Sequence, residues 1–323
     1  MERKLRLSYV DFCKVFAMFM VTMAHCAQSL SGEQFPSLLI SKDSFISVNM
    51  AIFMIASGFV MNIDKMKSTG TKNYIMSKAS RLLVPMTIWF LVICVVKKQL
   101  LFSLYWSYYW YLSALFMCLI TIKLLTNVVS NIVVVCFVSI LFHSLAPMIE
   151  FERSCYMIPF IWVGYFLRLV INRINWFYTI ILVVVYAFLY LSWDVSYSIY
   201  ISPFHIWESN AISFFTLGYR FLIGTVGGVA FISLARLLME RLGFSWMSFL
   251  SRFGAYTLVF YTMSFVLNSL LAKVMWHFDV FIATPGVLDL FSVIISALMI
   301  IVMYYFQVIV GKVRVLSALF LGY

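Results

Sequence analysis

Charged residues are scarce in this sequence. Asp, Glu, Lys and Arg together make up 11% of its 323 residues, whereas a soluble domain carries about 25%. Hydrophobic residues make up 64%, and the mean hydropathy is +1.01. This composition excludes an ordinary soluble protein and predicts an all-α fold, a polytopic bundle of transmembrane helices.

Acidic residues are the scarcer of the two charged kinds, with 12 Asp and Glu against 23 Lys and Arg and a formal net charge of +11. Such an excess can indicate a nucleic-acid partner. Here the cations lie mainly in short segments between apolar stretches, where a positive excess sets the orientation of membrane helices. We therefore expect membrane lipid, and no nucleic acid, around this chain.

Motifs for several other kinds of chemistry are also missing. The six cysteines lie mostly within apolar stretches, with no CxxC pair and no metal-ligand spacing, so we predict neither a disulfide framework nor a metal site. No internal repeat and no pair of helices broken by Gly or Pro is visible, which weakens the case for a secondary transporter. No loop has room for a soluble domain, so residues 1–323 are predicted to form one membrane domain.

Ten apolar stretches predict ten transmembrane helices. They cover residues 8–30, 44–63, 82–97, 108–124, 131–147, 156–172, 176–193, 211–235, 253–272 and 287–311. With the N-terminus in the cytoplasm, sixteen Lys and Arg lie on the cytoplasmic side and two lie within spans. Five lie outside: Lys42, Lys97, Lys98, Arg153 and Lys273. This bias predicts that both termini are cytoplasmic.

The first apolar stretch follows the basic segment MERKLR and so also resembles a signal peptide. Two charged residues, Asp11 and Lys14, interrupt its start, no convincing small-x-small cleavage site follows, and many spans come after it. We therefore expect a retained transmembrane helix.

This first helix carries an unusual polar stripe. At about 100° per residue, six residues fall within a wedge of roughly 80°: Asp11, Lys14, Met18, Thr22, His25 and Ser29. Lys14 and His25 align along the helix axis about 16 Å apart. Ionisable groups inside a membrane are costly and usually functional, although a polar seam that only packs helices is the alternative.

A second informative stretch lies around the end of the second span. The step Ser57-Gly58 would let a helix or a ligand approach the backbone closely. Lys78 and Arg81, three residues apart before the third span, could bind a polyphosphate. The alternative explanation of these cations is membrane orientation and contact with lipid headgroups.

Three groups of residues occur in order along the chain. They are Tyr9-x-Asp11-x-x-Lys14 followed after ten residues by His25, then Ser57-Gly58-Phe59, then Lys78-x-x-Arg81-Leu82-Leu83-x-Pro85. Further matches are Trp110-Tyr111-Leu112, Gly164-Tyr165 and Phe253-Gly254-x-Tyr256-Thr257-Leu258-x-x-Tyr261. The ordered set resembles the acyltransferase-3 family of integral-membrane O-acyltransferases, and its opening most resembles the fucose 4-O-acetylase-like branch.

The resemblance implies ten helices in a bacterial inner (cytoplasmic) membrane. It also implies an O-acetyltransferase that moves an acetyl or other acyl group from cytoplasmic acetyl-CoA (acyl-CoA) to a hydroxyl on the far side. The acceptor would be a cell-envelope polysaccharide or a lipid-linked sugar.

The catalytic residues predicted with this resemblance are His25, Asp11 and Lys14. A histidine with an ordinary pKa of about 6.5 could deprotonate the acceptor hydroxyl, or it could carry the acyl group as a nucleophile. Lys14 would attract the negative charge of the donor, and Asp11 would neutralise Lys14. The remaining assignments are donor binding by Ser57, Lys78 and Arg81, and substrate binding by Trp110, Tyr111, Tyr261 and Arg220.

Several expectations concern the outer side and the other histidines. Two outer segments, Glu150–Arg153 and Asp194–Glu208, could meet the acceptor, whereas His143 and His277 are expected at the membrane interface. Two other functions stay open. A transporter of a small solute or glycan precursor would show solute flux and indifference to acyl-CoA, and a non-catalytic scaffold would tolerate His25→Ala.

Overall fold

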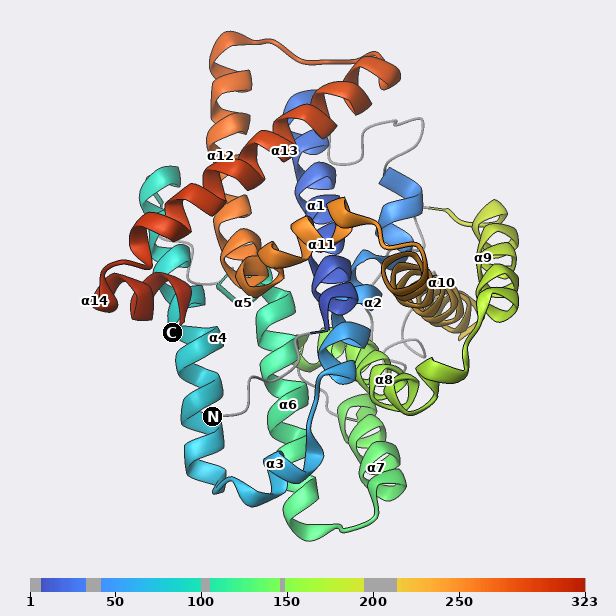
Figure 1. The fold of residues 1–323 in the computed structure, drawn as a ribbon. Coiled ribbons are helices and arrows are strands. Elements are labelled where there is room, and N and C mark those ends of the chain that lie inside the picture. The colour runs from blue at the N-terminus through green and yellow to red at the C-terminus, as the bar shows by residue number, and fades with distance from the viewer. Residues whose placement is uncertain (1–6, 33–41, 100–104, 146–148, 195–213, 323) are drawn as a thin grey trace.

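The structure is a computed structural model that describes residues 7–32, 42–99, 105–145, 149–194 and 214–322. For residues 42–46, 106, 107, 145, 149–153 and 214 it describes the backbone alone. The regular elements within these ranges are all helices, which confirms the predicted all-α bundle (Figure 1).

Ten long helices within the described ranges correspond to the ten predicted spans. They are α1 (Ser8–Ser31), α2 (Lys42–Phe59), α4 (Thr71–Lys97), α6 (Trp110–Val128), α7 (Ile132–Leu145), α8 (Ile149–Val170), α9 (Trp176–Leu191), α10 (Phe214–Arg241), α12 (Thr257–Phe278) and α13 (Pro285–Val310). By length and composition, seven segments could cross a membrane, and α2, α7 and α9 contribute shorter apolar helices.

Short elements connect the long helices or follow them. They are α3 (Ile63–Ser68), α5 (Tyr105–Tyr108), η2 (Ile171–Arg173), α11 (Ser245–Ser251), η5 (Arg252–Tyr256), α14 (Arg314–Leu316) and η6 (Ser317–Leu321).

The third long helix differs from its prediction. The apolar run suggested residues 82–97, whereas α4 begins at Thr71 and continues through Pro85. Its first three turns are polar and include Lys78 and Arg81, so hydropathy alone places them outside the membrane. These two cations therefore lie on a helix that extends beyond the apolar run.

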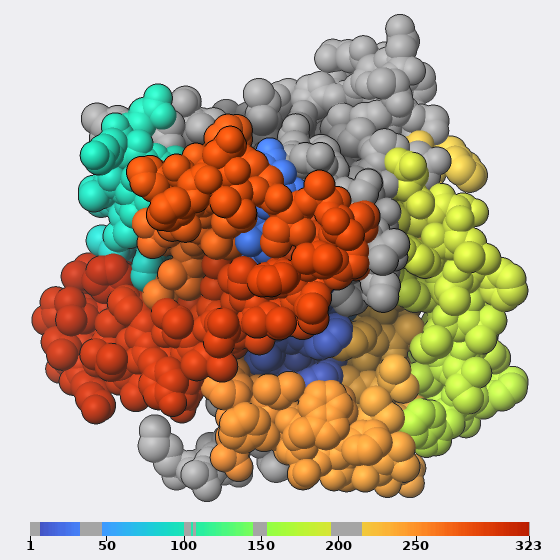
Figure 2. Space-filling model, turned by 90° about the horizontal axis from the view of Figure 1, so that it is seen from above, coloured from blue at the N-terminus to red at the C-terminus, as the bar shows by residue number. Residues whose placement is uncertain are grey.

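α1 lies at the centre of the bundle. It packs against α2, α10, α11, α12, α13 and η5. Within an apolar stretch of 18 residues of α1, 72% of the residues are buried inside the protein, the largest share among the seven candidate spans. In Figure 2 the blue atoms of α1 are visible only between neighbouring segments. The charged residues of α1 are thus surrounded by protein and not by lipid, as membrane charges usually are.

α2 and α8 are in direct backbone contact through a pair of glycines. A Cβ atom at Gly58 would lie 1.8 Å from the carbonyl oxygen of Ile161, and one at Gly164 would lie 1.9 Å from that of Ile55. Small residues allow this kind of close approach between membrane helices. Packing therefore explains the Gly58 and Gly164 motifs, and it fixes the position of the adjacent Ser57.

This contact predicts that Gly58→Ala and Gly164→Ala each destabilise the protein by at least about 1–3 kcal/mol, because the new methyl group must push two backbones apart. The measurement is the thermal midpoint of the detergent-solubilised protein by size-exclusion chromatography. Gly218→Ala on α10 is the matched control, since nothing lies within 4 Å of its added Cβ. Equal thermal midpoints for all three variants would contradict the glycine contact.

Candidate functional site

Asp11 and Lys14 form an ion pair near the N-terminal end of α1. Lys14 Nζ lies 3.6 Å from Asp11 Oδ1, and 19% and 11% of the two side chains are exposed. A charge in such a place is costly unless a partner of opposite sign lies beside it. Asp11 is thus close enough to neutralise Lys14.

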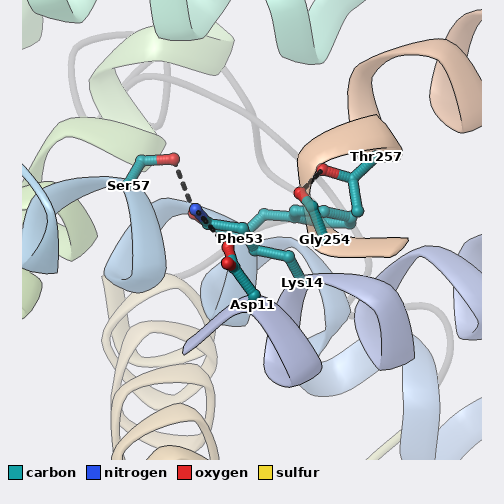
Figure 3. Close-up of polar contacts among 6 residues, drawn as sticks. All are labelled: Asp11, Lys14, Phe53, Ser57, Gly254 and Thr257. Atoms are coloured by element: carbon teal, nitrogen blue, oxygen red, sulfur yellow. Dashed lines mark hydrogen bonds and ion pairs between the residues drawn. The ribbon is translucent and has the colours of Figure 1, made fainter. Parts of the chain in front are cut away.

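The surroundings of this pair are formed by η5 and α2 (Figure 3). A Cβ atom at Gly254 would lie 2.4 Å from the Cβ of Asp11, so η5 packs directly on α1. On α2, the Ser57 hydroxyl donates to the carbonyl oxygen of Phe53 at 2.8 Å. In Figure 3 the Lys14 side chain extends in the direction of α2.

An inner cavity of about 480 Å³ lies on the side predicted to be cytoplasmic. The three predicted donor-binding residues, Ser57, Lys78 and Arg81, line this cavity together. Lys65 of α3 also lines it, and no acidic side chain does so among the described residues. The sequence analysis missed Lys65 because it counted that lysine only as a cytoplasmic loop charge.

The wall that carries Lys65 is held by two cations of neighbouring helices. Lys123 of α6 is 1% exposed, and its ammonium group donates to the carbonyl oxygen of Met66 at 2.7 Å. Arg168 of α8 donates to the carbonyl oxygen of Met61 at 3.2 Å. These contacts hold the chain on both sides of Lys65.

An outer cavity of about 840 Å³ lies at the opposite end of α1, and His25 lines it. His25 Nδ1 is 3.1 Å from Gln28 Oε1, and the imidazole centroid is 4.9 Å from that of Phe265. Ligand pockets are typically about 300–1,000 Å³, so this space is large enough for a small ligand. Other lining residues that the sequence analysis did not assign to a site include Lys97, Asn268, Lys273, Trp276 and His277.

An aromatic column, formed by the side chains of Tyr111, Tyr261 and Phe265, lies between the two cavities. The Tyr111 ring centroid is 5.3 Å from that of Phe53, which lies one turn before Ser57 on α2. The ring centroids of Tyr111 and Tyr261 are 5.4 Å apart, as are those of Tyr261 and Phe265. Phe265 in turn contacts His25. A continuous line of side chains therefore runs from one cavity to the other.

The comparison with protein families identifies the chain over nearly its whole length. The model of Acyl_transf_3, described as an acyltransferase domain, matches residues 7–306. The chain belongs to this family. No curated protein and no solved structure matches the chain. The match covers all lining residues of the outer cavity and all of the inner cavity except Leu321. The protein is therefore a membrane acyltransferase.

Three predicted substrate residues of the acyltransferase lie between its cavities. Tyr111 and Tyr261 are 5% and 2% exposed, and the Trp110 ring packs edge-on against Tyr111 with centroids 6.5 Å apart. None of the three is among the described residues that line either cavity. Their place is therefore in and beside the aromatic column that separates the cavities.

Arg220 lies apart from both cavities. Its side chain is 2% exposed, and its guanidinium carbon is 4.9 Å from the centroid of the Tyr156 ring. A cation over an aromatic face is a favourable contact, more so when water is excluded. The Tyr156 ring of α8 is thus one of the partners that an arginine inside the membrane needs. Arg220 does not line either of the two cavities.

His143 was expected at the membrane interface, and the structure places it in the last turn of α7. The side chain is buried, with Nδ1 2.8 Å from Ser154 Oγ and Nε2 3.0 Å from Thr121 Oγ1. Two hydroxyl partners allow this burial. His277 lies in the last turn of α12 and lines the outer cavity.

Some expectations fall outside what the structure describes. The side chains of Glu150–Arg153 and residues 195–208 are not among the described parts, and only Asp194 of the second outer segment is. Where residues are described, no three His, Cys, Asp or Glu side chains gather closely enough to hold a metal ion.

The buried Lys123 contact gives a stability prediction. Lys123→Met keeps much of the side-chain volume but leaves the Met66 carbonyl and Asn127 Oδ1, 2.8 Å from Nζ, without their charged donor. Hydrogen bonds to charged groups contribute about 1.5–3 kcal/mol, so the thermal midpoint should fall. Lys312→Met, at an exposed lysine, is the control and should not change it. A thermal midpoint of Lys123→Met equal to that of the wild type would show that this contact does not stabilise the protein.

Proposed function

We propose that the acyltransferase transfers an acetyl group from cytoplasmic acetyl-CoA to a hydroxyl of a cell-envelope polysaccharide or lipid-linked sugar, outside the inner membrane of a bacterium. The observation that carries the proposal is the position of the two cavities at opposite ends of the aromatic column. The donor would bind in the inner cavity, and the acceptor would bind beside His25 in the outer cavity.

The inner cavity suits the phosphates of coenzyme A. Lys65, Lys78 and Arg81 line one cavity. Lys78 experiences electrostatic repulsion from both Arg81 and Lys65. Three cations held together repel one another, and an anion that binds among them offsets this repulsion by its attraction to all three. Arginine can bind a phosphate through two parallel hydrogen bonds, and lysine acts on it as a point charge.

The contact of His25 with Gln28 supports a role as general base. An amide oxygen only accepts hydrogen bonds, so Gln28 Oε1 favours the tautomer with hydrogen on Nδ1. The lone pair of Nε2 is then able to accept the proton of the acceptor hydroxyl. As that oxygen attacks the thioester carbonyl, a C–O bond forms, the C–S bond breaks, and the proton passes on to the departing thiolate.

Nucleophilic catalysis is the second possible route at the same residue. Nε2 would attack the thioester carbonyl, the C–S bond would break, and the coenzyme A thiolate would take up the proton from Nδ1, leaving an acyl-imidazole. The acceptor oxygen would then displace the imidazole and lose its proton to it. Both routes need the acetyl group to reach His25 from the inner cavity, along the aromatic column.

The pair of Asp11 and Lys14 would act on the donor side. Lys14 is near α2 and is neutralised by Asp11 at 3.6 Å. A negatively charged donor would compete with Asp11 for the ammonium group, so Lys14 would be drawn to the donor only when the donor is present. The ion pair with Asp11 supports this role of Lys14 in attracting the donor, because without a donor the two charges cancel.

His25→Ala should reduce transfer of labelled acetyl from acetyl-CoA to envelope glycan by about 10²–10⁴-fold, the usual contribution of a general acid or base. The measurement uses membranes that contain equal amounts of folded protein, judged by thermal midpoint. Full transfer by a folded His25→Ala protein would falsify the catalytic assignment. A labelled, hydroxylamine-sensitive protein in the absence of acceptor would favour the nucleophilic route.

The paired variants Lys78→Ala and Arg81→Ala should raise the KM for acetyl-CoA, about tenfold for each charged contact of about 1.4 kcal/mol that is lost. They should also weaken the dependence of this KM on salt, because fewer charges attract the donor. Lys72→Ala is the matched control, at an exposed lysine on the same helix that does not line the cavity. A KM unchanged from wild type would leave Lys78 and Arg81 as determinants of membrane orientation.

A further inference from the structure

Two lysines make the outer cavity electropositive. Lys97, the last residue of α4, and Lys273 of α12 both line it together with His25. The described lining residues include no aspartate or glutamate. Asp279 comes after the end of α12, but it does not line the cavity.

Both ammonium groups are held by neutral partners. Lys97 Nζ donates to the Tyr108 hydroxyl at 2.5 Å and lies 5.0 Å from the centroid of that ring. Lys273 Nζ donates to the carbonyl oxygen of Val96. Within the described ranges, neither lysine forms an ion pair with a carboxylate. Among the described residues, their charges are therefore held in place by neutral groups and not by carboxylates.

Membrane orientation does not account for these two cations. Lysine and arginine are favoured on the cytoplasmic side, and sixteen are predicted there against five outside. Lys97 and Lys273 belong to the five, and two distant parts of the sequence bring them to one cavity. A ligand that needs positive charge explains their presence where the orientation rule disfavours them.

The rest of the lining suits a saccharide. Trp276 and Tyr108 offer flat apolar rings, against which the C–H face of a sugar ring can pack. Gln28, Gln99 and Asn268 offer amides that can both donate and accept hydrogen bonds. A mainly apolar pocket with a few convergent polar groups is the usual form of a small-ligand site.

We infer that the acceptor is an anionic saccharide, in which a carboxylate or phosphate binds Lys97 and Lys273 while the hydroxyl to be acylated faces His25. This inference rests on the proposed function and adds the charge class of the acceptor. The shared chemistry is a negatively charged oxygen group on a sugar, which both a uronic-acid-type carboxylate and a sugar phosphate provide.

The first test isolates the product of the acceptor reaction. Membranes with the wild-type enzyme are incubated with labelled acetyl-CoA, any lipid is cleaved off, and the labelled glycan is applied to an anion-exchange column. Retention that is lost after carbodiimide reduction identifies a carboxylate, and retention lost after dephosphorylation identifies a phosphate. Either result supports the inference. A labelled but neutral glycan overturns it, whereas absence of label in wild type contradicts the proposed function itself.

The second test asks whether these lysines bind the acceptor. Lys97→Gln and Lys273→Gln should each raise the KM for the isolated glycan several-fold to about tenfold and leave the KM for acetyl-CoA unchanged, with partial recovery in Lys97→Arg and Lys273→Arg. Lys98→Gln is the matched control, next to Lys97 in sequence but not in the cavity lining. An unchanged acceptor KM in both glutamine variants overturns the inference.

Discussion

The position of charged and polar groups on α1 constrains the rest of the bundle. Asp11 and Lys14 can be buried only as a pair, and only where protein surrounds them. Accordingly, α1 is covered by α2 and by α10 to α13, and η5 approaches so closely that Gly254 has no room for a side chain. With α1 in the centre, its two ends lie between other helices, and His25 opens onto a cavity and not onto lipid.

The two cavities differ in the chemistry that their walls offer. The inner one combines three cations with a small hydroxyl side chain, and its wall is held by the buried Lys123. The outer one combines an imidazole with two lysines, amides and aromatic rings. The rings of Tyr111, Tyr261 and Phe265 lie between them. The proposed reaction would join substrates from two aqueous compartments, and rings in this position would narrow any passage for ions between them.

Much of this arrangement could be predicted from the sequence, and the reasons for the failures are physical. Hydropathy located the ten helices. Ser57, Lys78 and Arg81, which the sequence analysis assigned together to donor binding, line one cavity. Helical periodicity placed Lys14 and His25 on one face, yet only His25 reaches a cavity. Periodicity shows that two residues share a helix face, but it does not show which part of that face a neighbouring helix covers.

Residues that act across distant segments were harder to predict. Lys97 and Lys273 are 176 positions apart in sequence, and each alone looks like an ordinary charge at the end of a span. Tyr111 and Tyr261 were expected to bind substrate, and neither lines one of the two cavities. A single aromatic residue in a membrane sequence does not reveal whether it packs against other rings or lines a space. The hydroxyl partners of His143 were missed for a similar reason, since Ser154 and Thr121 come from other helices.

The glycine contact between α2 and α8 has a consequence for movement. Where two backbones touch, no side chains lie between them that could change rotamer, so the two helices behave as one rigid body. Phe53 and Ser57 belong to this body through α2. The rings of Tyr111, Tyr261 and Phe265 belong to α6 and α12 and can turn about their side-chain bonds. Under the proposed function, the acetyl group would pass these rings, and their rotation beside the rigid pair of α2 and α8 would let it through.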